Sequence, residues 1–430
     1  MSFDTLGLSP ALLRALSEAG YATPTPIQTD AIPLALSGHD LLAGAQTGTG
    51  KTAAFGLPLL QTLAADATVQ RRPRALILTP TRELAAQVAA SLRDYGKHLS
   101  LRIATVFGGV GMQPQVDALR RGVDILVATP GRLIDHLDRG SVDLSQVRIL
   151  VLDEADRMLD MGFLPAINRI LKRLPTQRQT LLFSATFAPE IKALAQQFMR
   201  NPREVQVTPS NSTAPRVRHL LHPVDSEQKR DLLLHVLAAD SRRQTLVFCR
   251  TKHGSDKVQR ILERAGLRAA AIHGNKSQNA RTRALADFKS GKITVLVATD
   301  IAARGIDIDQ LPAVINLDLP NVPEDYVHRI GRTGRAGAEG LAISLVSSEE
   351  SEQLRAIERL LDSAIEKVEV EGFIPTRPLK MTPPGRQAQP GKPRPAGAAN
   401  NRHRRPHRGA QNARPGQGGD APRPARRIAR

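Results

Sequence analysis

Short apolar runs separated by longer amphipathic stretches fill most of the first 380 residues of this 430-residue chain. The runs have the length and composition of strands buried inside a sheet. The stretches between them carry apolar residues at helical spacing. Strands that alternate with helices form parallel sheets joined by right-handed crossovers, so the chain is predicted to be an α/β protein. The predicted strands are 75–78, 125–128, 149–152, 181–183, 245–248, 269–272, 295–298, 314–317 and 342–346, and the predicted helices include 82–95, 164–174, 254–265 and 279–288.

Composition along the chain predicts two domains, a linker and a tail. Residues 201–216 are rich in Pro, Ser, Thr and Asn, and we expect them to link a first domain, 1–200, to a second, 217–376. The tail, 377–430, is predicted to be disordered, because its last 50 residues hold 12 Lys and Arg, nine Pro and one acid. A helix and a strand within 360–372 are expected to precede it.

Charge and cysteine content narrow the class of protein. The formal net charge of +19 is typical of chains that meet polyanions. The single cysteine, Cys249, excludes an intrachain disulfide and a four-cysteine zinc site, which fits a reducing cytosol. No apolar run approaches the roughly 18 residues of a membrane span, so no membrane association is expected. The first residues lack the features of a secretion signal.

A glycine-rich segment that follows the apolar stretch 40–42 and precedes a helical stretch matches the phosphate-binding loop, with Ala45 in place of the first glycine. Backbone N–H groups at the helix N-terminus would point at a β-phosphate. Lys51 would neutralise β/γ-phosphate charge, and the Thr52 hydroxyl would bind Mg²⁺. A Gly/Thr-rich turn with an incidental lysine is the alternative. The predicted loop residues are Ala45, Gln46, Thr47, Gly48, Thr49, Gly50, Lys51 and Thr52.

The segment 148–156 is a predicted buried strand that ends in acidic residues. Asp153 stands where a strand-end carboxylate would hold Mg²⁺, and Glu154 can orient and deprotonate an attacking water. A helix N-terminus whose dipole favours acids is the alternative. That alternative explains the charge but not the pairing with an upstream phosphate loop. Together the two segments predict an ATPase or GTPase.

Asp153-Glu-Ala-Asp156 is also the signature of the DEAD-box RNA helicases, and residues 1 to about 370 resemble that family. The resemblance implies two tandem RecA-like domains, each a parallel sheet with helices on both faces. It implies an enzyme that uses ATP and Mg²⁺ to unwind or remodel RNA locally. The short extensions and Arg-rich tail are most similar to the bacterial RhlE subgroup.

The segment 20–28 resembles the Q motif of the family. The amide of Gln28 can accept from adenine N6 and donate to N7, a pairing that guanine does not offer. Tyr21 lies where the aromatic residue of the family stacks on adenine. Without the resemblance, the two would be an ordinary turn residue and a helix-start residue.

Three segments that follow predicted strands resemble motifs that grip the RNA backbone. In a parallel sheet such loops gather at one edge, where small residues and arginines can approach phosphates. Taken singly, each is also an ordinary turn followed by a helix cap. The predicted RNA-binding residues in these segments are Pro80, Thr81, Arg82, Gly109, Thr129, Pro130, Gly131 and Arg132.

Ser184-Ala-Thr186 resembles a motif whose hydroxyls bind the acidic motif and couple hydrolysis to RNA binding. A strand-end serine and a helix-capping threonine are the alternative. The segment 298–307 resembles motif V, which implies that Thr299 contacts RNA phosphate and Asp307 the ribose of ATP.

The segment 328–335 resembles motif VI, in which His328 has a coupling role. Arg332 and Arg335 would meet the charge that builds on the γ-phosphoryl group, and such an arginine finger can be worth about 10³–10⁵ in rate. A bland basic loop does not explain the His-Arg-x-Gly-Arg-x-Gly-Arg spacing. Gln278 and Arg281 match motif IVa more loosely.

The expected partner is RNA, single-stranded or in short duplexes, held through its backbone without sequence specificity. Ribosome precursors or the RNA-degradation machinery are further candidate partners, and the expected location is the cytoplasm. Two rival functions remain open: a DNA-directed motor, and an RNA-annealing or clamping protein that uses ATP only to gate binding.

Overall fold

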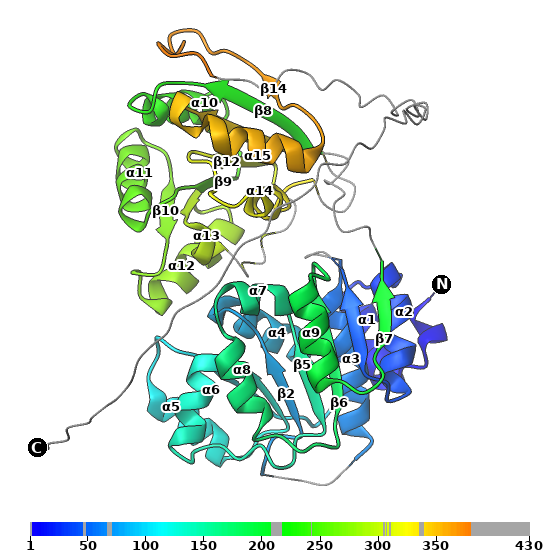
Figure 1. Cartoon of the computed structure of the whole chain (residues 1–430). Helices are drawn as coiled ribbons and strands as arrows, with labels where there is room; N and C mark the ends of the chain where they lie inside the picture. The colour runs from blue at the N-terminus through cyan, green and yellow to red at the C-terminus, as the bar shows by residue number, and fades with distance from the viewer. Residues whose placement is uncertain are drawn as a thin grey trace, which may run out of the picture. The chain divides into compact units, whose positions relative to one another are not determined.

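The computed structural model describes residues 2–45, 49–66, 71–207, 217–241, 243–303, 306, 308, 311–334 and 339–379. These residues form two seven-stranded sheets in which every strand pair is parallel (Figure 1). The predicted disordered tail lies outside the described residues except for 377–379. No helix in the described ranges is long and apolar enough to cross a membrane.

The first sheet has the order β3-β4-β2-β5-β6-β1-β7. Its strands are β1 (Leu41–Gly44), β2 (Ala75–Leu78), β3 (Ile103–Val106), β4 (Ile125–Ala128), β5 (Ile149–Leu152), β6 (Gln179–Ser184) and β7 (Arg203–Gln206). Its helices are η1 (Phe3–Leu6), α1 (Pro10–Glu18), α2 (Pro26–Leu36), α3 (Lys51–Ala64), α4 (Arg82–Tyr95), α5 (Met112–Arg120), α6 (Pro130–Asp138), α7 (Ala155–Asp160), α8 (Leu164–Leu171) and α9 (Pro189–Phe198).

The second sheet has the order β10-β11-β9-β12-β13-β8-β14, which repeats the order of the first strand for strand. Its strands are β8 (Val217–Pro223), β9 (Thr245–Phe248), β10 (Ala269–Ile272), β11 (Val295–Ala298), β12 (Ala313–Asn316), β13 (Gly340–Val346) and β14 (Glu366–Lys367). Its helices are α10 (Lys229–Ala238), α11 (Lys252–Arg264), α12 (Gln278–Lys289), α13 (Asp300–Ala303), α14 (Pro323–Ile330), η2 (Ser348–Glu350) and α15 (Ser351–Leu361).

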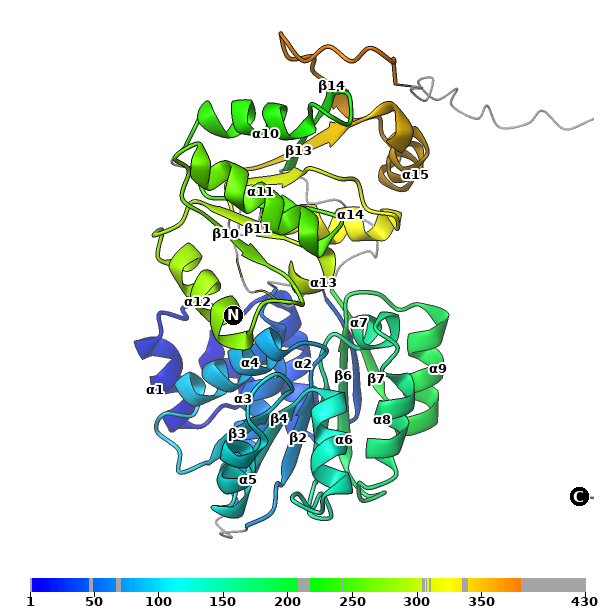
Figure 2. The ribbon, with the colours of Figure 1, turned by 90° about the vertical axis from the view of Figure 1, so that its left-hand side faces the viewer.

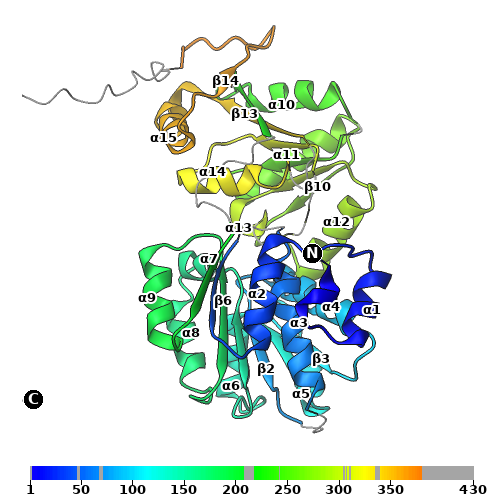
Figure 3. The same cartoon turned by 90° about the vertical axis from the view of Figure 1, so that its right-hand side faces the viewer.

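Helices cover both faces of each sheet. In the first sheet, Ala75 and Ile77 of β2 pack in one buried cluster with α1 to α4, and Leu76 and Leu78 pack in another with α5 to α9. Figure 3 shows α1 to α4 to one side of this sheet and α7 to α9 to the other. In the second sheet, α10 and α11 cover one face, while α14 and α15 lie on the other side (Figure 2). Successive strand residues face opposite layers, which is why the strands read as continuous apolar runs.

The predicted strands agree closely with the structure. Six of them have the same bounds in the structure: 75–78 (β2), 125–128 (β4), 149–152 (β5), 245–248 (β9), 269–272 (β10) and 295–298 (β11). The predicted strand 314–317 begins one residue earlier, at Ala313. The first part of the predicted linker 201–216 is not a linker in the structure. It contains β7, which pairs with β1 and extends the first sheet to Gln206. Residues 208–216 lie outside the described residues.

Candidate functional site

The carboxyl ends of the parallel strands in the first sheet lie at one edge, and a cavity of about 380 Å³ opens there. It is lined by residues from α2, the start of α3, α4 and the β5–α7 connection. Ile306 and Arg332 of the second sheet's half complete the lining. Its volume is in the range of small-molecule sites.

The phosphate-loop segment leads directly into α3. Gly50 has φ 92°, and a Cβ at this position would lie 2.3 Å from Nε2 of Gln28, so only glycine fits. Lys51 and Thr52 follow at the helix start and line the cavity. Nζ of Lys51 is buried without a hydrogen-bond partner in the described part of the chain. The predicted Gln46, Thr47 and Gly48 lie outside the described residues, and Ala45 is buried.

The acidic segment follows β5. Asp153 is 2% exposed, and burial raises its pKa to about 7, although the positive charge of Lys51 opposes the rise. Its Oδ1 is buried and, like Nζ of Lys51, has no hydrogen-bond partner among the residues that the structure describes. Glu154 has left-handed backbone angles, φ 53° and ψ 53°, and lines the same cavity. A non-glycine residue held in this region is strained and is typical of functional sites.

The last acid of this segment, Asp156, joins it to the loop after β6. Its Oδ2 accepts from the backbone N–H groups of Ala185, at 3.0 Å, and Thr186, at 3.2 Å. The Thr186 hydroxyl lies 3.5 Å from the same oxygen. We expected the Ser184 hydroxyl to reach the acidic motif as well. It donates instead to the carbonyl oxygen of Thr186 at 2.7 Å, because the loop turns that carbonyl back toward it.

Gln28 is buried beside the glycine-rich loop. Its Oε1 accepts from the Thr25 N–H at 2.9 Å, and its Nε2 donates to the carbonyl of Gly50 at 3.1 Å. An amide offers two lone pairs and two hydrogens, so each end keeps one position for a further partner. The side chain therefore fixes the phosphate loop and also lines the cavity.

An aromatic cluster closes the same end of the cavity. The Tyr21 ring meets Phe3 edge-on at 6.4 Å and Tyr95 edge-on at 5.8 Å, and the two tyrosine hydroxyls lie 3.0 Å apart. Tyr95, with Gln87 and Ser91 of the same helix, was not predicted as a site residue. The helical spacing of these three α4 residues places them on one side of α4, facing the cavity.

The loops predicted to bind nucleic acid lie together at this edge of the sheet. Thr81 caps α4 by accepting from the Leu84 N–H. The Arg82 guanidinium packs on Gly109, where φ is 77° and a Cβ would lie 1.9 Å from Nη1. Arg132 donates to the carbonyl of Val110 at 3.1 Å. Pro80 and Thr129 are buried at the ends of their strands, and Pro130 and Gly131 form the first turn of α6.

Residues of α12 meet the same loops. Arg281 lies 2.9 Å from Oε1 of Glu83, which also accepts from Nε2 of Gln278 at 2.9 Å. Burial, together with the positive charges of Arg281 and Arg132, lowers the pKa of Arg82. A site in which three guanidinium groups stand close together favours an anionic ligand. The sequence matched Gln278 and Arg281 only loosely and gave no indication of this contact with Glu83.

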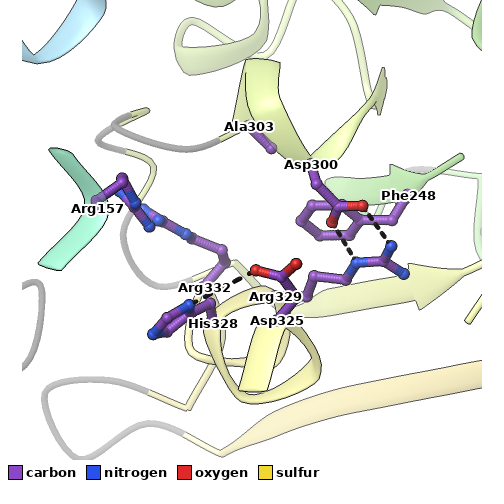
Figure 4. A pocket seen from close by; sticks show the side chains of 8 residues that line it. All are labelled: Arg157, Phe248, Asp300, Ala303, Asp325, His328, Arg329 and Arg332. Atoms are coloured by element: carbon purple, nitrogen blue, oxygen red, sulfur yellow. Dashed lines mark hydrogen bonds and ion pairs between the residues drawn. The ribbon is translucent and has the colours of Figure 1, made fainter. Parts of the chain in front are cut away.

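The motif VI segment contributes α14 and the turn after it. Arg332 is 3% exposed, donates to the carbonyl of Ile306 at 2.7 Å and lines the nucleotide-sized cavity. Arg329 makes a paired contact with Asp300 at 2.5 and 2.7 Å (Figure 4). His328 lies 3.9 Å from Asp325. The buried Thr299 precedes α13, and the predicted Arg335 and Asp307 lie outside the described residues.

The comparisons with known proteins agree with this arrangement. A family model described as DEAD/DEAH box helicase matches residues 25–194, and one described as helicase conserved C-terminal domain matches residues 228–337. The ATP-dependent RNA helicase DeaD of Buchnera aphidicola is 43% identical over 86% of this chain, and the match spans 61% of that relative. The DEAD-box ATP-dependent RNA helicase CshA of Bacillus cereus is 44% identical over 86% of this chain and 70% of that relative.

Among solved structures, S. cerevisiae Dbp5 bound to RNA and ADP BeF3 has a TM-score of 0.77 and 32% identity, covering 86% of this chain and 96% of that one. The two family models follow one another along the chain in the order of its two sheets. The RecA-like fold predicted from the resemblance is confirmed in both halves. The chain belongs to the DEAD-box helicase family.

Proposed function

We propose that this protein couples RNA-stimulated ATP hydrolysis to local, non-processive unwinding or remodelling of RNA. One observation carries the proposal: Nζ of Lys51 and Oδ1 of Asp153 are both buried without a partner in the described ranges and face one cavity. Buried charged groups are costly unless a partner compensates them. A nucleoside triphosphate with a divalent cation supplies both partners, an anionic phosphate for the lysine and a cation for the carboxylate.

Thr52 and Asp153 are the residues that would hold Mg²⁺, which fits the unpartnered carboxylate oxygen and the hydroxyl at the start of α3. When bound, the ion would neutralise charge on the β- and γ-phosphates. Asp153 must be ionised for this role. Because its pKa is raised to about 7, binding of the cation should weaken as the pH falls below that value.

The chain's own groups divide the chemistry between them. Lys51 neutralises phosphate charge, and Glu154 orients a water molecule and accepts its proton. Arg332 stabilises the charge that develops on the γ-phosphoryl group, and Arg335 is proposed to act with it. Lys51 and Glu154 belong to the first domain and Arg332 to the second, so the complete set requires both halves. Asp307 is proposed to contact the ribose, and the loop of Gln46 to Thr49 the phosphates.

The cavity end formed by Tyr21 and Gln28 is proposed to receive adenine, with the base stacked on Tyr21. Tyr95 supports that ring from the side through an edge contact and a hydroxyl pair. The free amide positions of Gln28 can then distinguish adenine from guanine.

Replacing Tyr95 with phenylalanine should raise the KM for ATP while leaving kcat unchanged. The ring contact is kept, whereas the hydroxyl loses its pair with Tyr21 and its side-chain hydrogen bond with Ser91. A hydrogen bond is worth about 0.5–1.5 kcal/mol, so we expect a rise of about two- to tenfold. Steady-state kinetics at saturating RNA measures this. Tyr326→Phe is the matched control, because its hydroxyl pairs with His219 away from the cavity.

RNA is proposed to bind along the loop edge, through Arg82, Arg132 and the backbone around Gly109, with Thr299 on the second domain. These contacts reach phosphates and sugars, so they carry no sequence specificity. The bonds between Asp156 and the loop of Ser184 and Thr186 connect that edge to the acidic motif, and His328 is proposed to share this coupling.

The cellular setting is also a proposal. We propose that the protein belongs to the bacterial RhlE subgroup because of its Arg-rich tail and the wording of its motifs. A cytoplasmic location is supported by the single, buried Cys249, and ribosome precursors or RNA-degradation machinery are proposed as partners.

The test is hydrolysis of ATP and of GTP, each with no nucleic acid, with single-stranded RNA and with DNA of the same sequence. We expect stimulation by RNA that is confined to ATP. Equal stimulation by DNA would favour the DNA-directed motor. RNA binding that depends on ATP, without stimulated hydrolysis or strand separation, would favour the annealing or clamping protein.

A further inference from the structure

We propose that Arg157 is a positioning residue for the catalytic carboxylate of Glu154. Nη1 of Arg157 donates to Oε2 of Glu154 at 2.6 Å, and the side chains are 7% and 5% exposed. The inference rests on the proposed role of Glu154 as the base. The sequence shows no sign of it beyond a spacing of three residues on a short helix.

The two partners face different cavities. Glu154 lines the nucleotide-sized cavity, whereas Arg157 lines a smaller one with His328, Arg329 and Arg332 (Figure 4). The guanidinium that holds the carboxylate therefore does not itself line the nucleotide-sized cavity. Held through Oε2, the carboxylate keeps Oε1 for a water molecule on the nucleotide side.

The backbone at Glu154 is strained as well. Glu154 is the N-cap of α7 in a left-handed conformation, and Arg157 in the first turn of that helix bonds back to its carboxylate. The Arg157 N–H also bonds to Oδ1 of Asp156 at 2.9 Å, so the pair is tied to the acid that holds the Ser184–Thr186 loop. A buried ion pair adds little to stability, because desolvation offsets the attraction. We therefore infer that the Arg157–Glu154 pair serves to fix the position of the base and not to stabilise the fold.

The smaller cavity adds a link to the second domain. Arg332 lines both cavities, and Arg157 shares one of them with it. Asp300 and Asp325 supply negative charge there, with Asp300 already paired to Arg329. Arg157 therefore stands between the base on the first domain and the arginine on the second.

Arg157→Gln is expected to lower the RNA-stimulated kcat by about 10- to 100-fold, the cost of a loosely held reacting group. The KM for ATP, and the Kd for RNA with a non-hydrolysable ATP analogue, should change less than about twofold, because Arg157 touches neither ligand. Arg157→Lys keeps the charge and should retain kcat within about threefold of the wild type. Arg169→Gln is the matched control, because it removes an exposed arginine paired with Asp138 on the same domain.

A second substitution separates positioning from a general structural role. In a Glu154→Gln background, Arg157→Gln should cause no further loss of rate, because the two side chains act as one unit. An equal loss in both backgrounds, an unchanged kcat, or a change seen only in KM would overturn the proposal. Thermal unfolding checks that each variant is folded, and Arg157→Met, similar in length and uncharged, replaces Arg157→Gln if that variant is unfolded.

Failure of this inference differs from failure of the proposed function. If Glu154→Gln hydrolyses ATP at the wild-type rate, the role of Glu154 itself is wrong. If Glu154→Gln is inactive while folded Arg157→Gln turns over normally, only the role of Arg157 is wrong.

Discussion

Glu154→Gln is expected to lower RNA-stimulated ATP hydrolysis by about 10²–10⁴-fold, the usual contribution of a positioned general base. Glutamine keeps the shape of the side chain and its hydrogen bond to Arg157, but it cannot accept a proton from water. ATP and RNA should still bind, because Lys51, Gln28 and the loop-edge arginines are unchanged. The variant should therefore remain on RNA after ATP is added.

Single-turnover hydrolysis and RNA dissociation rates measure these two effects separately. Glu190→Gln, an exposed substitution at the start of α9, is the matched control and should behave as wild type. Rapid release of RNA by an inactive Glu154→Gln would contradict the coupling of hydrolysis to RNA release. Wild-type turnover would contradict the assignment of the base.

Arg332→Lys, a substitution in the second domain, is expected to lower the rate of ATP hydrolysis by a comparable factor. It should lower kcat by about 10³-fold, the lower end for an arginine finger, because Arg335 remains. Lysine keeps the positive charge but lacks the planar guanidinium that matches a phosphoryl group. It also loses the hydrogen bond that Nη1 of Arg332 donates to the Ile306 carbonyl. The KM for ATP should change little, because the main effect is on the transition state.

The control for this variant is Arg218→Lys, which alters an exposed ion pair with Glu366 in the same domain. Hydrolysis without RNA should also be compared. A loss of kcat that appears only with RNA would assign Arg332 to RNA coupling instead of to phosphoryl transfer.

The sequence predicted the central strands of both sheets well, because each is an uninterrupted apolar run. It missed β7, Arg203–Gln206, where only Val205 is buried and the neighbouring side chains are polar. It also missed β8, whose run is interrupted by Arg218, His219 and His222. These strands are defined by hydrogen bonds to a neighbour, and that information is not present in a local apolar pattern.

Among the site residues, too, a local sequence pattern predicted some, whereas others depend on contacts that form only in the folded chain. Those that end parallel strands or begin helices, such as Lys51 and Asp153, could be predicted because topology brings these positions to one edge. Tyr95, Arg157 and the Glu83–Arg281 pair could not, because each acts through a partner that only the folded chain brings near. The position of the Ser184 hydroxyl depends on a loop turn that the three-residue motif does not specify.

The hydrophobic clusters of the two halves have a consequence for heat denaturation. Among the described residues, each buried cluster draws its members from one sheet and its own helices. The two halves can therefore melt at different temperatures, and a single midpoint would not describe the whole chain. A cavity made in one half, for example Leu150→Ala, would lower one transition and leave the other in place. ATP, for which we propose contacts from residues of both halves, would bring the two transitions together.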